Sequence, residues 1–530
     1  MRFKKAFLWL LVSSTFLSAQ MTWLNNGQLK LGVNLSLGGA VTYLSELPAD
    51  INMINSYDWG RQIQMSYYSD PIPYAPNGNQ PKAEWAMLGW NPIQSGDCYG
   101  NRSTVLTYTN ADSQIYVKCI PMHWPLNNVP GECTFEVWYK LNGKTITVRS
   151  RINNARPETT WFAAKEQEQP AIYTNGPWYK LVTYIGDAPF TNAPVTEVVK
   201  KDDGLGFPWR RFSSPEQWMA LVNDNNHGLG VWSLGHVNMC GGFAGGDSRK
   251  GSGGATDVQT GYISPIGIDI LDSKITYDYN YTIIIGDVNE IRQYAKTHAQ
   301  YGEPFTWTFM SDRQHWTYTG SARDQGWPIY NQLDIRWTDS TATILSPKTF
   351  WNADSFSQLT ISADFKSCTE PLKIRLYAFD STDLKHWPQW GEGLRPPASH
   401  DIEYFLYPTG SGFKTYKLDL SYKTAYMNSF TRIEIKLPGT NGSISLSSIK
   451  LDKYVDSSKG VVNLSLIDSV ISQNINTQAT VRLLRAGTEV KQISCNNGVC
   501  KITADSGSNY IINVSAAGYS SKISIPLFLT

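Results

Sequence analysis

Residues 274–285 read Lys-Ile-Thr-Tyr-Asp-Tyr-Asn-Tyr-Thr-Ile-Ile-Ile, and this stretch decides the fold class. Isoleucine or tyrosine stands at every second position from 275 to 285, and mostly polar residues stand between them. A period of two with β-branched and aromatic side chains is typical of a strand that is buried on one face. The same alternation recurs at 28–35, 113–119 and 145–149, so the sequence predicts an all-β protein.

Helical signals are few and short. Ser214 followed by Pro215 has the features of a helix start, but the segment runs directly into a strand pattern. Residues 289–298 have room for two or three helical turns. Neither segment changes the predicted class.

The rhythm of the strands changes along the 530 residues and indicates three domains. Residues 21–318 form one long run of strands and suit a large super-sandwich, in which two sheets stack face to face. From 325 to 455 the spacing shortens to that of a jelly-roll β-sandwich. After a Ser-Ser-Lys-Gly linker, residues 460–530 hold enough short strands for a small Ig-like β-sandwich.

The first 20 residues have the layout of a secretory signal peptide. Arg2, Lys4 and Lys5 precede an apolar run over residues 6–17. This run is shorter than the roughly 20 residues that cross a bilayer, and no later segment is long and apolar enough. We therefore expect a secreted, extracellular protein that has no membrane partner.

The charge and the aromatic content of the chain indicate which classes of partner it binds. Charged residues make up 17% of the chain and the formal net charge is +1, which argues against nucleic acid as a partner. Aromatic residues reach 13%, with 19 Trp and 29 Tyr. Their flat rings suit the faces of sugars, although they also fill the cores of β-sandwiches. We expect a monomer whose substrate or ligand is a polysaccharide or another glycan.

The seven cysteines of an exported chain indicate disulfides better than a metal site. Asn497-Gly498 is a strong hairpin-turn signal that brings Cys495 and Cys500 together, so these two are predicted to be bridged. Cys119 and Cys133 bracket a Pro-rich loop that a second bridge would hold in shape. The pairing of the other three stays open: Cys98, Cys240 and Cys368.

The sequence gives only weak evidence for glycosylation and none for a specific metal-binding motif. Asn-x-Ser/Thr acceptors for glycosylation begin at Asn34, Asn101, Asn280, Asn441, Asn463 and Asn513, a number close to chance for this composition. The sequence has no HExxH or EF-hand motif, so no cofactor or metal is expected, and a structural Ca²⁺ held by loop carboxylates stays an open alternative. It also has no GxSxG motif, which excludes a conventional α/β-hydrolase.

Residues 37–44, Leu-Gly-Gly-Ala-Val-Thr-Tyr-Leu, and the following segment 52–64 resemble the opening of galactose-mutarotase-like super-sandwich domains. The resemblance covers about the first 300 residues and implies a sugar-binding face on the first domain. The middle block is similar to jelly-roll carbohydrate-binding modules, and the last to Ig-like accessory domains of polysaccharide-active enzymes. Mutarotases use a catalytic His with a Glu base, and no pair in this sequence matches that motif locally.

The densest group of candidate catalytic residues is Glu166 and Glu168. On a strand these side chains share one face, with Cα atoms about 6.5 to 7 Å apart, a separation that suits paired acid and base on a glycosidic bond. We expect Glu168 to be the more important, because it lies nearer a possible sugar platform, and Glu166 to tune its protonation. The platform would comprise Tyr173, Trp178 and Tyr179. The competing interpretation is a solvated strand face.

Two further groups of residues suit either a functional or a structural role. His123 lies beside Trp124 in the Pro-rich loop, where it would be a general acid or base or a hydrogen-bonded structural histidine. Asp58, Trp59 and Arg61 offer a carboxylate, a stacking ring and a bidentate donor, although an Asp/Arg pair that braces a turn is commoner.

Together these features favour a secreted carbohydrate-active enzyme, a glycoside hydrolase or polysaccharide lyase, that uses carboxylate or His acid/base chemistry. One alternative is a lectin-like or matrix protein that binds glycans without catalysis. Another is an extracellular hydrolase of a polyanionic or ester polymer, supported only by Arg61, His123 and Arg210.

Overall fold

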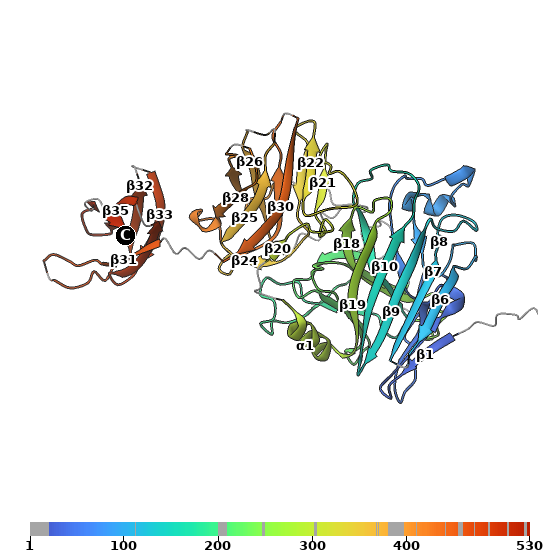
Figure 1. Ribbon diagram of the computed structural model, residues 1–530. Helices are drawn as coiled ribbons and strands as arrows, with labels where there is room; N and C mark the ends of the chain where they lie inside the picture. Colours follow the sequence, from blue (N-terminus) through green and yellow to red (C-terminus); the bar gives the residue numbers. More distant parts are fainter. Residues whose placement is uncertain are drawn as a thin grey trace, which may run out of the picture.

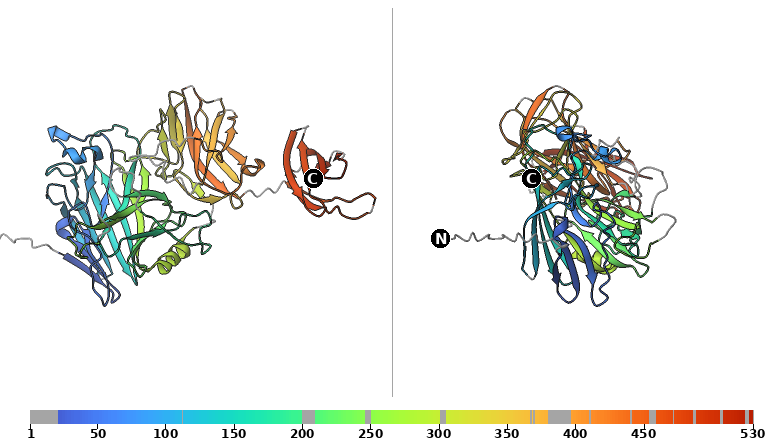
Figure 2. Two further views of the ribbon diagram at one scale, coloured as in Figure 1. Left: turned by 180° about the vertical axis from the view of Figure 1, so that it is seen from behind. Right: turned by 90° about the vertical axis from the view of Figure 1, so that its right-hand side faces the viewer.

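The structure is a computed structural model, shown in Figures 1 and 2. It describes residues 21–111, 113–199, 209–245, 250–300, 305–366, 368, 370–379, 397–409, 411–439, 441–453, 459–470, 472–485, 488–505, 508–523 and 527–529. The expected signal peptide, residues 1–20, lies outside the described residues. Antiparallel sheets dominate the described chain, so the predicted all-β class is confirmed.

Sheet I is one layer of the first sandwich. Its strand order is β1-β2-β3-β4-β11-β18-β17-β14, and β5 joins β4 to β8. The strands are β1 (Met21–Asn25), β2 (Leu29–Asn34), β3 (Ala40–Glu46), β4 (Ile63–Ser66), β5 (Pro92–Ile93), β8 (Met122–His123), β11 (Lys165–Thr174), β14 (Arg210–Ser213), β17 (Asn238–Ala244) and β18 (Thr260–Asp269).

Sheet II is the facing layer, with the order β13-β12-β15-β16-β19-β10-β9-β7-β6. Its strands are β6 (Thr104–Asn110), β7 (Gln114–Ile120), β9 (Cys133–Asn142), β10 (Thr145–Asn154), β12 (Lys180–Thr183), β13 (Thr196–Glu197), β15 (Trp218–Val222), β16 (His227–Trp232) and β19 (Thr276–Asp287). Side chains from both sheets form one buried core, so the first sandwich has the two-sheet architecture that the sequence predicts.

The stretch that decides the fold class forms β19, in the middle of sheet II between β10 and β16. Tyr279, Tyr281, Ile283 and Ile285 lie on its inner face and are buried in the core. The predicted helix at 289–298 is α1 (Val288–His298), which begins with a capping box at Asp287.

The helical signal at Ser214 and Pro215 is wrong. Ser214 closes a turn to Gln217 through a 2.9 Å backbone hydrogen bond, and the chain enters β15 directly. Pairing with β12 and β16 buries every residue of β15, so the sheet overrides the local helix-start signal.

The Gly-Gly pair in 37–44 has a steric cause. Gly38 and Gly39 follow a short 3-10 turn, η1 (Leu35–Leu37), with φ values of +61° and +83°. A Cβ on Gly39 would lie 2.6 Å from Val117 of sheet II, too close for any side chain. Glycine here lets sheet I approach sheet II closely. Two other 3-10 turns follow in the same sandwich, η2 (Pro76–Gly78) and η3 (Ala83–Leu88).

The second sandwich has its own two sheets and its own core. Sheet III contains β20 (Phe305–Trp307), β22 (Leu333–Trp337), β25 (Gln358–Asp364), β28 (Lys414–Asp419) and β30 (Gly442–Asp452). Sheet IV contains β21 (Thr317–Thr319), β23 (Thr343–Leu345), β24 (Trp351–Asn352), β26 (Leu372–Ala378), β27 (Ile402–Leu406) and β29 (Ser429–Lys436). A 3-10 turn, η4 (Leu420–Tyr422), follows β28.

Strand pairing moves residues 305–318 from the first block, to which the sequence assigned them, into the second. β20 pairs with β30, and β21 pairs with β23. The two sandwiches also touch, because Ile270 at the end of β18 joins the second core and Arg313 forms an ion pair with Asp272 at 2.6 Å.

The C-terminal strands form a smaller core. They are β31 (Lys459–Ser465), β32 (Ala479–Arg485), β33 (Thr488–Cys495), β34 (Val499–Asp505), β35 (Ser508–Ala516), β36 (Lys522–Ile523) and β37 (Leu527–Leu529). Cys495 and Cys500 are bridged with their Cα atoms 5.2 Å apart, which confirms the predicted hairpin disulfide.

The second predicted disulfide is wrong, because Cys119 and Cys133 are both buried and unbonded. In the register of β7 with β9, Cys119 lies opposite Phe135, so Cys133 lies one diagonal away. Diagonal neighbours are about 7 to 8 Å apart, beyond the usual reach of a disulfide. Cys98, Cys240 and Cys368 are also unbonded among the described residues.

The described chain offers neither a membrane-spanning helix nor a cluster of metal ligands. Within the described ranges, no helix has the length and apolar character needed to cross a bilayer. Across the same ranges, no group of three or more His, Cys, Asp or Glu side chains is arranged to hold a metal ion.

Candidate functional site

The outer face of sheet I carries the candidate site, and β11 sets which side chains point to it. Gln169 of β11 donates a 2.8 Å hydrogen bond to Tyr277 of sheet II, so it points between the sheets. Side chains alternate along a strand, and Glu166 and Glu168 therefore point outward. A register shift follows Glu168, and Tyr173 beyond it contacts Tyr262 on the outer face.

Glu168 is held between two tyrosine hydroxyls. Tyr68 donates to its Oε2 at 2.7 Å, and Tyr262 of β18 donates to its Oε1 at 2.5 Å. Burial, together with the charge of Glu168, raises the pKa of both tyrosines well above the usual value, so both keep their protons. Glu168 is partly exposed, and the two hydroxyl donors hold its carboxylate in place.

Aromatic rings stand beside this carboxylate. The ring centroids of Tyr173 and Tyr262 are 4.9 Å apart, and those of Trp209 and Tyr262 are 5.0 Å apart. Tyr173 and Trp209 remain partly exposed, while Tyr262 is buried beneath them. Flat rings beside a carboxylate suit the apolar face of a sugar whose hydroxyls reach the carboxylate.

Asp58 and Arg61 border the same group, since their charges act on the hydroxyl of Tyr173. Arg61 lies over the ring of Tyr57 at 4.7 Å and donates to the carbonyl of Val258 at 2.8 Å. Its Nε lies 3.3 Å from Asp58 Oδ2, so the Asp/Arg pair does brace a turn.

Trp59 and Arg210 have contacts of other kinds. Trp59 packs under Arg102, with the guanidinium 5.6 Å from the ring centroid. Arg210 donates to the carbonyl of Val199 at 3.1 Å.

Glu166 has a different environment from Glu168. Arg211 of β14 binds it in a bidentate manner, with Nε 2.9 Å from Oε1 and Nη2 2.7 Å from Oε2. The Glu166 side chain is only 6% exposed, and its charge is balanced by Arg211. The hypothesis that Glu166 tunes the protonation of Glu168 therefore gives way to a buried ion pair that supports the face.

His123 and Trp124 are not on this surface. His123 is fully buried, its Nε2 lies 2.9 Å from Glu132, and the rings of Tyr74 and Trp90 pack against it. Burial alone would raise the pKa of Glu132, but the contact with His123 outweighs it, and the pKa is about 2. Trp124 is buried too. The proposed catalytic role of His123 is therefore replaced by the structural alternative.

The proposed platform at 173–179 is divided between environments. Trp178 is buried in the core between sheets I and II, because it lies beyond the end of β11 where the chain turns inward. Tyr179 is half-exposed, donates to Asp224 at 2.6 Å, and has Lys250 4.1 Å from its ring centroid. Of the three aromatic residues, Tyr173 is the one in the ring group beside Glu168.

Sequence reasoning missed Tyr68, Trp209, Arg211 and Tyr262. These residues come from three segments that are separated by up to about 200 positions, and only strand pairing brings them to β11. The signal in the sequence is local: Tyr262 lies in a strand-like run, and Trp209 with Arg211 in an aromatic and basic one.

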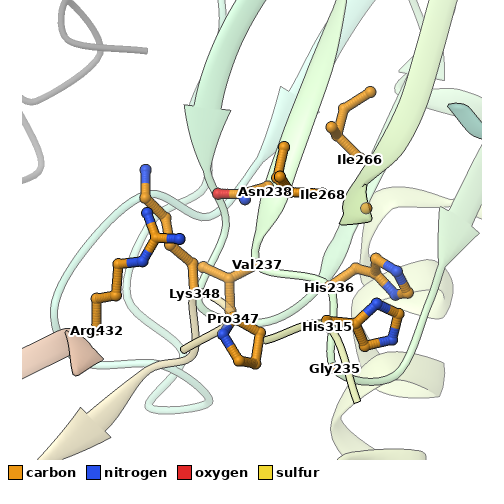
Figure 3. A pocket seen from close by; sticks show the side chains of 11 residues that line it. Gly235, His236, Val237, Asn238, Ile266, Ile268, His315, Pro347, Lys348 and Arg432 are labelled. Carbon is orange, nitrogen blue, oxygen red and sulfur yellow. The ribbon is translucent and has the colours of Figure 1, made fainter. Parts of the chain in front are cut away.

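Farther along the outer face, sheet I meets the second sandwich at a small cavity (Figure 3). Ile266 and Ile268, which pair with Glu168 and Glu166 across β11 and β18, form one side. Lys348 and Arg432 of the second sandwich line it as well. Its volume of about 20 Å³ has room for a single water molecule.

A chain of hydrogen-bonded polar groups, partly buried, lies beside this cavity. His315 donates to Asp269 at 2.8 Å, Tyr277 donates to the same carboxylate at 2.6 Å, and Gln169 connects Tyr277 to His236. Burial lowers the pKa of His236 to about 4. Burial also opposes charge on His315, but the Asp269 carboxylate outweighs it and raises its pKa. The chain therefore links Gln169 of β11 to His315, which precedes the second sandwich's strand β21, through hydrogen bonds.

Comparisons with known proteins add little about function. No protein-family model matches the sequence, and no curated protein is significantly similar to it. A galactose mutarotase related enzyme from Lactobacillus acidophilus is a similar solved structure, with 12% identity, coverage of 50% of this chain and 97% of that chain, and a TM-score of 0.34.

Other similar structures share these low values. A putative aldose 1-epimerase from Escherichia coli K12 has 12% identity, coverage of 51% of this chain and 99% of its own, and a TM-score of 0.30. The glycoside hydrolase domain of Endo-D from Streptococcus pneumoniae R6 has 10% identity, coverage of 42% of each chain, and a TM-score of 0.19. Residues 37–44 and 52–64 resemble the same mutarotase-like group. TM-scores this low give no argument about function, so the proposal below rests on the geometry of the site.

Proposed function

We propose that the first sandwich acts on a glycan, with Glu168 as its catalytic base. The observation that carries this proposal is the carboxylate of the partly exposed Glu168, held by Tyr68 and Tyr262 beside the rings of Tyr173 and Trp209. A carboxylate held in place next to a sugar-sized aromatic surface can take a proton from a sugar hydroxyl or carbon.

The environment of Glu166 restricts the reaction class. Hydrolysis by two carboxylates needs one of them to deliver a proton to the leaving oxygen. Glu166 is paired with Arg211 and buried, so it is poorly suited to that task. The arrangement therefore supports chemistry that begins with proton abstraction by Glu168 better than two-carboxylate hydrolysis.

The same ion pair supports a second candidate, a glycan-binding protein without catalysis. In that case Tyr173 and Trp209 hold the sugar, and Glu168 accepts hydrogen bonds from its hydroxyls. Secretion is part of both proposals and is supported by the charged and apolar pattern of residues 1–17.

A panel of plant, algal and microbial polysaccharides separates the candidates. The mature protein is incubated with each polymer while reducing ends, unsaturated products and binding are recorded. New reducing ends or unsaturated products support an enzyme and distinguish a hydrolase from a lyase. Binding without either product supports the second candidate, and neither binding nor product on any polymer would contradict a role on glycans.

A further inference from the structure

A separate groove lies on the second sandwich, along the outer face of β22 of sheet III. Its volume is about 700 Å³, within the range of sites that hold small-molecule ligands. Arg323, Asp334, Arg336, Thr338 and Lys366 contribute to its lining. Ile335 and Trp337, which alternate with the polar residues of β22, are buried in the core below. The groove is thus built on a rigid strand.

Two arginines stand side by side in this groove. The backbone N–H of Arg323 donates to the carbonyl of Arg336 at 3.0 Å, and that of Arg336 donates to the carbonyl of Arg323 at 2.8 Å. Residues that exchange both hydrogen bonds are direct antiparallel partners, and their side chains leave the same face about 5 Å apart at Cβ. Both arginines are exposed. Like charges at directly opposed positions destabilise a sheet unless something balances them.

The carboxylates that line the groove already have hydrogen-bond and ion-pair partners. Asp324 is buried and bound by Arg313, with Nε 2.6 Å from Oδ2 and Nη2 2.7 Å from Oδ1. Asp334 accepts two hydrogen bonds from Gln332 and lies 3.3 Å from Lys366.

Neither arginine of the pair forms an ion pair with any carboxylate in the described part of the chain. The guanidinium of Arg323 lies over the ring of Trp161, 5.9 Å from the ring centroid. The pair therefore presents two positive charges and two planar sets of donors to the groove.

We propose that Arg323 and Arg336 form an anion-binding site for an acidic glycan, one that carries carboxylate or sulfate groups. Adjacent guanidinium groups match such an anion with paired N–H donors, and the groove has room for the sugar units around it. A nucleic acid would need a longer basic surface, which a chain of net charge +1 does not favour. The choice of a glycan rests on the proposed function, whereas the affinity for an anion rests on the arginine pair alone.

The test measures binding of the full mature chain to polygalacturonate, to a sulfated galactan and to neutral dextran. Arg323→Gln with Arg336→Gln should weaken binding to the acidic polymer about 100-fold, since each substitution removes hydrogen bonds to a charged group. Arg323→Lys with Arg336→Lys keeps the charges but loses the planar donors, and should weaken binding about 10-fold. Added salt should weaken binding of the unmodified protein.

The matched control is Lys414→Gln with Lys417→Gln, which removes two exposed charges from β28, a strand of sheet III that does not pair with β22. Binding to polygalacturonate or to the sulfated polymer alone would support the site and identify the anion. Equal loss in the control variant, or unchanged affinity in both arginine variants, would overturn the proposal. Equally strong, arginine-dependent binding of a single-stranded oligonucleotide would overturn its glycan part.

The test of anion binding in the groove can be separated from the test of the proposed role of Glu168. The loss of binding caused by Arg323→Gln with Arg336→Gln should be about 100-fold both in the unmodified protein and in a Glu168→Gln protein, whether or not the first sandwich is an enzyme. A loss that disappears in the Glu168→Gln background would contradict the independence of the two sites.

Discussion

Replacing Arg211 with Gln tests whether Glu166 is a structural ion. The substitution leaves the Glu166 carboxylate without its guanidinium partner, at a side chain that is 6% exposed. Breaking one side of a buried pair costs about 3 to 5 kcal/mol. Arg211 itself is 21% exposed, so water screens part of the effect and we expect a loss near the lower end, about 3 kcal/mol in the free energy of unfolding.

The loss should depend on pH. In the variant, burial favours the neutral form of Glu166, so its folded-state pKa lies above the unfolded value of about 4.3. A group with a raised pKa supports folding below its unfolded pKa and loses this contribution as the pH rises through its folded pKa. The difference in stability between the variant and the unmodified protein should therefore be largest near pH 7 and shrink below about pH 4.

Urea unfolding followed by tryptophan fluorescence measures both the loss of stability and its dependence on pH. Trp209 is a reporter close to the ion pair, since its ring contacts that of Tyr262 on the same face. Glu166→Gln with Arg211→Gln is the control, since it replaces the ions by two neutral groups that can bond to each other, and it should recover much of the lost stability. A loss under 1 kcal/mol in Arg211→Gln, or a loss that does not change between pH 7 and pH 4, would refute the structural role of Glu166.

Three further outcomes are expected. Trp209→Ala should weaken glycan binding about 10-fold by isothermal titration, as removal of an aromatic contact residue often does, and unchanged affinity would exclude the ring from the sugar surface. Cys495→Ser with Cys500→Ser should destabilise the C-terminal strands by about 2 kcal/mol in thermal unfolding, the loop-closure value for so short a loop, and no shift would show that the hairpin needs no bridge. The pKa of Glu132 is lowered to about 2, so its contribution to stability is present above its unfolded pKa and is lost as the pH falls from about 4.5 to 2. Glu132→Gln should therefore flatten the acid limb of the stability curve, and an unchanged limb would show that Glu132 makes no such contribution.

The sequence predicts most clearly what depends on local pattern. The alternation at 275–285 identifies β19, because its period of two is set by the pleat of a single strand. The Cys495–Cys500 bridge is equally local, since one hairpin turn brings both residues together.

The site depends on register, and the sequence predicts it only in part. Glu168 was identified because it shares a strand face with a second carboxylate, but its partners Tyr68 and Tyr262 are 100 and 94 residues away. The role of Glu166 does not follow from the sequence, because its partner Arg211 reaches it from β14, across β18 and β17. His123 looked reactive for a similar reason: nothing near it in sequence shows that Tyr74 and Trp90 cover it.

The most direct test of the central claim is the turnover of Glu168→Gln on the polymer that the native protein modifies, compared with Glu136→Gln. Glu136 is a fitting control because it is also a half-buried carboxylate that accepts a tyrosine hydroxyl, from Tyr116 at 2.6 Å, but it lies in sheet II. Since Gln keeps the shape and cannot take a proton, Glu168→Gln should lose about 100-fold or more in turnover while glycan binding survives, and Glu136→Gln should keep normal turnover. Normal turnover in Glu168→Gln would contradict the assignment of Glu168 as the catalytic base.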